Sequence, residues 1–147
     1  MEKAALPLLV FVESDSAHAD LCLRAVNESS VETEVLIFRD HDSLRVFLDE
    51  GRAVPRLFVL ECLSAGIDPH AVLRAIRGNE RTQNIPVVIH AHEQFVSDAD
   101  KLCAGGANSC FEKHASTQQF INRLSSAIRY WLFFNVAVRP VQQPRLP

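Results

Sequence analysis

The feature that most constrains the fold of this chain is an alternation of short apolar runs with stretches of helical spacing, which continues to about residue 130. A continuous apolar run is typical of a strand that is buried on both faces. Apolar residues three or four positions apart are typical of a helix that buries one face. The alternation therefore predicts a parallel sheet covered by helices, and a length of 147 residues corresponds to one such domain.

Five strands are predicted, each followed by a helix. The strands are expected at 8–12, 35–38, 57–60, 86–89 and 108–112, and the helix after the fourth strand at about 97–103. Asp68 and Pro69 form an N-cap with proline in the first turn, and Gly51 ends the helix after the second strand. Ser116 and Gln119 form a capping-box pattern that begins the last helix.

Composition and charge exclude several classes of protein. Hydrophobic residues make up 48% and charged residues 22% of the chain, a balance typical of a globular domain. The net charge is −3 and the basic residues are scattered, so no basic patch for nucleic acid is expected. The apolar run at 4–12 is too short to span a membrane, and the acidic Glu13 and Asp15 follow it where a cleavage site needs small neutral residues.

The four cysteines contain no C-x-x-C pair and lie among apolar residues. We therefore expect buried, reduced thiols at Cys22, Cys62, Cys103 and Cys110. Reduced thiols and the lack of an export signal both predict a cytoplasmic protein.

Polar and small residues follow the strands at the sheet edge where parallel α/β proteins bind ligands. They are Glu13, Ser14 and Asp15 after the first strand, Glu61 after the third, Ala91 and His92 after the fourth, and Lys113 and His114 after the fifth. These residues form either a functional pocket or a solvated rim of paired charges.

Two segments carry a resemblance to a known family. In residues 10–14 an apolar strand ends on Glu13 and Ser14, and in residues 55–61 another ends on Glu61. The chain resembles the receiver domains of two-component response regulators from residue 7 to about residue 131. The resemblance implies that Glu13 is retained from an acidic pair, that Ser14 replaces the second acid, and that Glu61 replaces the phospho-accepting aspartate.

Four further positions follow from the same resemblance. Ala91 stands where a threonine or serine usually ends the fourth strand, so the hydroxyl that reads the phosphoryl group is absent. Lys113 matches the lysine of the family. Cys110 stands at the position of an aromatic switch residue, and His114 at that of a proline.

The resemblance implies a receiver-like, flavodoxin-like α/β fold. Its five-stranded parallel sheet has the strand order 2-1-3-4-5, with helices on both faces and a C-terminal apolar extension. We expect a receiver-like domain at 1–131 and an extension or arm at 132–147.

The substitutions predict a degenerate phosphorylation pocket made of Glu13, Ser14, Glu61, Ala91 and Lys113. The longer side chain of Glu61 moves the carboxylate outward by roughly 1.5 Å, which misplaces a nucleophile but allows an ion pair with Lys113. We expect an atypical, non-enzymatic pseudo-receiver that acts through protein contacts without aspartyl phosphorylation, with no cofactor and doubtful Mg²⁺ binding. In the alternative, Glu61 only neutralises Lys113 and carries no signal.

Other functions remain open at this point. Asp68 or Asp15 could serve as a displaced phosphate acceptor, or a crevice of flavodoxin type could bind a small ligand such as flavin, although no Ser/Thr/Gly-rich phosphate loop follows the first strand. A zinc site formed by His92 and His114 with the nearby carboxylates is disfavoured because the histidines lack tight ligand spacing, so no metal is expected.

The C-terminal segment from 130 to 138 is a dense aromatic and β-branched run that needs cover. We expect Trp131, Phe133, Phe134 and Val136 to form a homodimer contact or exchanged arm, rather than to fold back on the domain. Residues 77–89 and 130–136 resemble the stand-alone response regulators paired with bacterial phytochromes, which implies dimers and a sensor histidine kinase or phytochrome-type photoreceptor as partner.

Overall fold

A five-stranded parallel sheet forms the centre of the protein. The computed structural model describes residues 5–62, 67–91, 98–112 and 116–134. The strands are β1 (Leu8–Val12), β2 (Glu34–Phe38), β3 (Leu57–Cys62), β4 (Val87–Ala91) and β5 (Ser109–Glu112). They pair in the order β2-β1-β3-β4-β5, which confirms the predicted topology.

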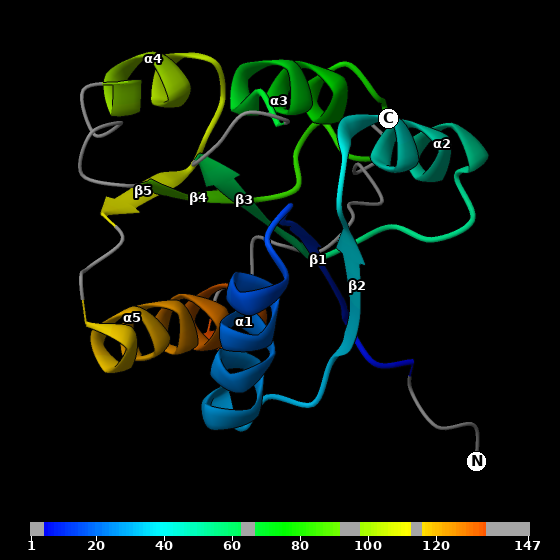
Figure 1. The fold of residues 1–147 in the computed structure, drawn as a ribbon. Helices are drawn as coiled ribbons and strands as arrows, with labels where there is room; N and C mark the ends of the chain where they lie inside the picture. The colour runs from blue at the N-terminus through cyan, green and yellow to red at the C-terminus, as the bar shows by residue number, and fades with distance from the viewer. Residues whose placement is uncertain (1–4, 63–66, 92–97, 113–115, 135–147) are drawn as a thin grey trace.

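Helices cover both faces of the sheet (Figure 1). One face carries α1 (Ser16–Ser29), α5 (Thr117–Arg129) and the π-helical turn η2 (Tyr130–Phe134). The other face carries α2 (His41–Glu50), α3 (Pro69–Arg77) and α4 (Ala99–Ala104). The apolar residues of the central strands β1, β3 and β4 alternate between two hydrophobic clusters, one on each face of the sheet.

The helices begin at the predicted caps. The Asp68 carboxylate accepts a hydrogen bond from the N–H of His70 at 2.9 Å, and Pro69 follows in the first turn. The Ser116 hydroxyl accepts one from the N–H of Gln119 at 3.4 Å. Gly51 ends α2 with a φ of 59°, a backbone conformation that a residue without a Cβ adopts at little cost.

The predicted ends of two strands and the span of one helix were wrong by a few residues. The strand β3 continues through Glu61 to Cys62, and β4 continues to Ala91, because Glu61 pairs with His90 and Cys62 with Ala91 in the parallel ladder. Backbone pairing thus carries both strands past the point where the apolar pattern stops. The helix expected at 97–103 is α4, at Ala99–Ala104.

The prediction of buried cysteines holds for one of the thiols that the structure describes. Cys22 is buried and Cys110 is half-buried, whereas Cys103 is exposed in the last turn of the short helix α4. Burial raises the pKa of the Cys110 thiol, with a smaller contribution from the nearby Cys103. None of these three cysteines forms a disulfide within the described part of the chain, and the side chain of Cys62 lies outside it.

Arg77, the last residue of α3, ties together the two loops that lead into β4 and β5. Its guanidinium donates to the carbonyl oxygens of Ile85 at 2.6 Å and Gly106 at 2.7 Å, and to the side-chain oxygen of Asn108 at 2.9 Å. Further bonds reach the carbonyls of Thr82 and Gln83. A planar, five-donor fork is suited to this arrangement of oxygens.

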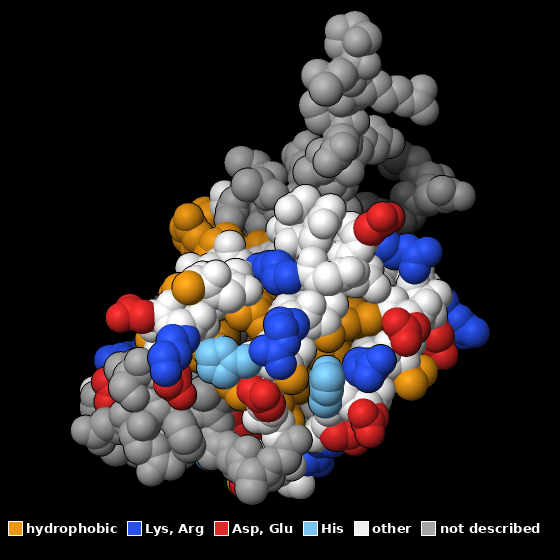
Figure 2. Space-filling model, turned by 90° about the horizontal axis from the view of Figure 1, so that it is seen from above, with side chains coloured by type: hydrophobic (Ala, Val, Ile, Leu, Met, Phe, Trp, Pro, Cys, Tyr) orange, Lys and Arg blue, Asp and Glu red, His pale blue; other side chains and the backbone are white. Residues whose placement is uncertain are grey.

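The face formed by α2, α3 and α4 carries charges of both signs, interspersed with histidine and small apolar areas (Figure 2). No helix within the described ranges is long and apolar enough to cross a membrane.

Candidate functional site

Three polar side chains form a row across adjacent strands at the carboxyl edge of the sheet. Glu61 on β3 is in register with His90 on β4. Val12 is in register with Leu60, so Glu13, the residue after β1, lies beside Glu61. The alternation of side chains along each strand directs all three toward α1 and α5.

The row is buried. Glu13, Glu61 and His90 expose 0%, 2% and 1% of their surface. Ser14 holds Glu61 in place, because its backbone N–H and its hydroxyl both donate to Glu61 Oε2, at 3.1 and 3.3 Å. The two positions at which the resemblance implies a substitution, Ser14 and Glu61, are therefore in direct contact.

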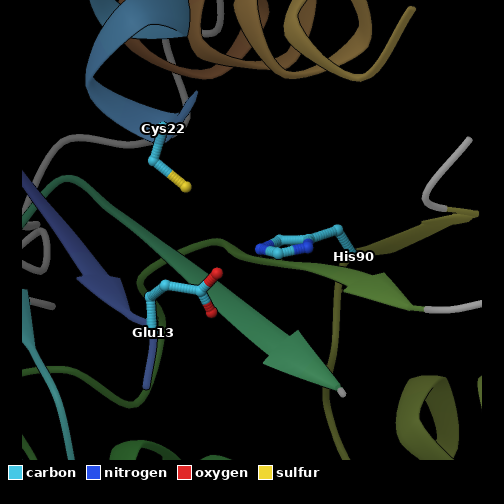
Figure 3. A group of neighbouring side chains, drawn as sticks. All are labelled: Glu13, Cys22 and His90. Carbon is cyan, nitrogen blue, oxygen red and sulfur yellow. The ribbon is translucent and has the colours of Figure 1, made fainter. Parts of the chain in front are cut away.

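Helix α1 covers the row with two further polar side chains, His18 and Cys22, which lie one turn apart on the same helix face. His18 Nδ1 is 3.4 Å from Glu13 Oε1. The nearest ligand atoms of Glu13, Cys22 and His90 all lie within 4.8 Å of one another. These three side chains point toward a common centre from β1, α1 and β4 (Figure 3).

The cluster places two carboxylates close together in a buried site. Glu13 and Glu61 are neighbouring buried carboxylates, and like charges in a desolvated site repel strongly. Neither carboxylate oxygen of Glu13 accepts a hydrogen bond within the described part of the chain. The Arg39 guanidinium donates only to the rim, to the carbonyl of Ser14 at 3.4 Å and the hydroxyl of Ser16 at 3.2 Å.

The structure brings together three of the five residues expected in the degenerate pocket, namely Glu13, Ser14 and Glu61. Ala91 belongs to the hydrophobic cluster on the opposite face of the sheet, and Cys110 packs against that same cluster. Lys113 lies outside the described residues, so its ion pair with Glu61 stays a prediction. The histidines His92 and His114, expected near the same edge, also lie outside them.

Both candidates for a displaced phosphate acceptor serve as helix caps. Asp15 accepts a hydrogen bond from the N–H of His18 at 3.1 Å and caps α1. Asp68 caps α3 in the same way. Each carboxylate stabilises a helix N-terminus in its present position.

His18, Cys22 and His90 were not predicted from the sequence as members of the site. Two signals could have indicated them. His90 interrupts an otherwise apolar strand, at a position that alternation directs to the same face as Glu61. His18 and Cys22 are spaced i, i+4 on the helix that follows the first strand, so they share one face.

The donor set fits a hydrated Mg²⁺ ion poorly. Mg²⁺ keeps several waters and takes oxygen ligands in octahedral geometry. Glu13 is fully buried, and its carboxylate lies beside the Cys22 thiol and two imidazoles as well as the Glu61 carboxylate. Glu61 Oε2 already accepts two bonds from Ser14. This mixed, desolvated donor set does not match the oxygen-only, partly hydrated shell of Mg²⁺.

An open hollow of about 450 Å³ lies at the opposite end of the sheet from this row. It is lined by residues from the last turns of α1 and the segment before β2, such as Leu23 and Val31. It is therefore separate from the carboxyl-edge crevice in which a flavodoxin-like ligand was considered.

The C-terminal aromatic residues differ in exposure. Trp131 packs against the cluster under α1 and α5, whereas Phe133 and Phe134 expose 73% and 66% of their surface. The rings of these two phenylalanines meet edge to face, with centroids 5.2 Å apart. Val136 lies outside the described residues.

Comparison with known proteins identifies relatives of this fold. No protein-family model matches the chain. Over 137 residues it is 28% identical to the probable methanogenesis regulatory protein FilR2 of Methanothrix harundinacea (strain 6Ac), covering 90% of this chain and 88% of that protein.

Solved structures give the same result for the fold. The phosphorylated cyanobacterial phytochrome response regulator RcpA is similar with a TM-score of 0.80 and 23% identity, over 89% of this chain and 97% of RcpA. The Mn²⁺-bound response regulator Rcp1 is similar with a TM-score of 0.78 and 22% identity, over 88% and 96% of the two chains. The predicted receiver fold and the resemblance to response regulators are confirmed.

Proposed function

We propose that this chain is an atypical receiver that works in two-component signalling through protein contacts and without aspartyl phosphorylation. Glu61 supplies a fixed carboxylate where a receiver would carry its phosphate acceptor. We propose a cytoplasmic, non-enzymatic module. This is in keeping with cysteines that form no disulfide among the described residues, and with the hydrogen bonds between Ser14 and Glu61.

The observation that carries this proposal is the pair of hydrogen bonds from Ser14 to Glu61 Oε2. A nucleophilic carboxylate must approach a phosphorus atom in line and with a metal ion beside it. Glu61 is buried and held by a backbone N–H and a hydroxyl, which stabilise its charge and lower its nucleophilicity. Ala91 adds no hydroxyl that could respond to a phosphoryl group.

Incubation with a small phosphodonor and Mg²⁺ is expected to leave the intact mass of the protein unchanged, because the Glu61 carboxylate is already held by Ser14. Intact-protein mass spectrometry measures this directly, and an active receiver domain treated in parallel serves as control for the donor. A phosphoryl adduct mapped to Glu61 would overturn the proposal. An adduct that disappears in Asp68→Asn or Asp15→Asn would instead establish transfer to a displaced acceptor.

We propose a sensor histidine kinase or a phytochrome-type photoreceptor as the partner, since similar structures include the response regulator of a cyanobacterial phytochrome. The purified chain is expected to co-elute with such a kinase in size-exclusion chromatography, and equally well with and without ATP, because complex formation would not depend on phosphorylation. Complex formation only in the presence of ATP, or separate elution in every mixture, would contradict this assignment.

We also propose that the protein forms a homodimer through its C-terminal aromatic residues. The support is the exposure of Tyr130, Phe133 and Phe134, which is 54% or more for each. Contiguous exposed aromatic side chains are typical of interfaces, and a two-fold contact buries the same patch on both copies.

A further inference from the structure

We propose that Glu13, Cys22 and His90 form a buried site for a divalent transition-metal ion of the Zn²⁺ class, with the partly exposed His18 beside Glu13 as a fourth candidate ligand. This inference goes beyond the proposed function and does not depend on it. The site shares Glu13 with the row at the carboxyl edge of the sheet and takes its other ligands from α1 and β4.

The ligand atoms are already close to the spacing that a bound metal ion requires. The ligand atoms of Glu13, Cys22 and His90 come from three different elements and lie within 4.8 Å of one another. Bonds of 2.0–2.3 Å to a tetrahedral ion place its ligands roughly 3.3–3.8 Å apart. The three side chains therefore need to close by only about 1 Å, a shift of the size that rotamer adjustment provides. His18 Nδ1, 3.4 Å from Glu13 Oε1, already stands at such a ligand spacing.

The burial of the Glu13 carboxylate also favours a bound metal ion. Its side chain is fully buried, and neither oxygen accepts a hydrogen bond from any described residue. Burying a carboxylate without hydrogen bonds is costly, so buried charges in proteins are paired or coordinate metals. The structure places the imidazole of His18 beside Glu13, and imidazole is a common metal ligand in proteins.

The types of ligand atom also favour an ion of the Zn²⁺ class. A carboxylate oxygen, a thiol sulfur and imidazole nitrogens form the ligand set of Zn²⁺ and related ions, whereas Mg²⁺ and Ca²⁺ take oxygen alone. An apolar shell surrounds this set, because the His90 ring lies 5.2 Å from that of Phe120 and 6.1 Å from that of Phe111. Such a shell orients a ligand and excludes competing water.

Titration of the metal-free full chain with Co²⁺ tests the proposal, since Co²⁺ replaces Zn²⁺ and reports its ligands by absorption. We expect one equivalent to give a thiolate-to-metal charge-transfer band with intense tetrahedral visible bands, and Zn²⁺ to abolish both. Cys22→Ser should remove the charge-transfer band. Glu13→Gln and His90→Gln should each weaken Co²⁺ binding at least as much as the loss of an outer-shell partner does, about 10- to 100-fold.

Matched controls separate this site from other thiols and histidines. Cys103→Ser, at the exposed thiol of α4, and His70→Gln, on α3, should leave the spectrum and affinity unchanged. Circular dichroism identifies any variant that fails to fold, and the metal site is then tested with the ligand variants that do fold. A wild-type titration without a charge-transfer band, or a band that persists in folded Cys22→Ser, would overturn the proposal.

Discussion

Replacing Arg77 by methionine is expected to lower the free energy of unfolding by about 2–4 kcal/mol. The guanidinium donates to four backbone carbonyls and to the Asn108 side chain, in the loops before β4 and β5. Methionine preserves much of the apolar stem but removes this donor from the carbonyls of Gln83, Ile85 and Gly106, whereas the Thr82 carbonyl and Asn108 Oδ1 each keep a bond from a backbone N–H. A buried acceptor that loses its partner costs about 1–3 kcal/mol. Urea denaturation followed by circular dichroism measures the change.

The matched control is Arg74→Met, one turn earlier on α3, where the side chain is exposed. That substitution is expected to change stability by less than about 0.5 kcal/mol. Arg77→Lys should recover only part of the loss, because a single ammonium cannot reach both loops as a planar fork does. Equal stability of the Arg77 and Arg74 variants would show that the observed bonds contribute nothing net.

The double substitution of Phe133 and Phe134 by serine is expected to raise the dissociation constant of the proposed dimer by about 30- to 1000-fold. Two aromatic residues at an interface centre together contribute about 2–4 kcal/mol, and each 1.4 kcal/mol corresponds to a factor of ten. Both rings are exposed in the single chain, so their replacement removes little from the domain core. Sedimentation velocity over a range of concentrations gives both dissociation constants.

Val46→Ser provides the control for a general change in surface hydrophobicity. Val46 on α2 is 57% exposed and lies on the other face of the sheet from η2. Its replacement should leave the dissociation constant unchanged. A wild-type protein that sediments as a monomer at all concentrations, or a Phe133/Phe134 variant that dimerises as tightly as wild type, would remove the dimer from the proposed function.

The fold could be predicted from the sequence because its signals are local. Apolar runs such as Leu8–Val12 mark strands, and the caps Asp68 and Ser116 mark helix starts through bonds made within three residues. The ends of β3 and β4 could not be predicted in the same way. Glu61 and Ala91 belong to strands because of pairing between β3 and β4, which are distant in sequence.

The site was predicted only in part for a related reason. Glu13, Ser14 and Glu61 follow or end apolar runs, so position along the chain indicates them. His90 and Cys22 lie inside a strand and a helix, where composition suggests ordinary core residues, and only the packing of α1 over β1 and β4 brings them together. For Cys103 the error is the opposite one. Its apolar neighbours suggested a buried thiol, whereas the side chain is exposed on the six-residue helix α4.

The register that aligns Glu13, Glu61 and His90 also has a consequence for sequence divergence. Because each of these side chains determines how its neighbour is solvated, a substitution at one position changes which residues are tolerated at the others. The row should therefore diverge as a unit among homologues, with correlated exchanges across β1, β3 and β4. A homologue with a substitution at only one of these positions would keep the fold but bury a charge that its neighbours no longer compensate.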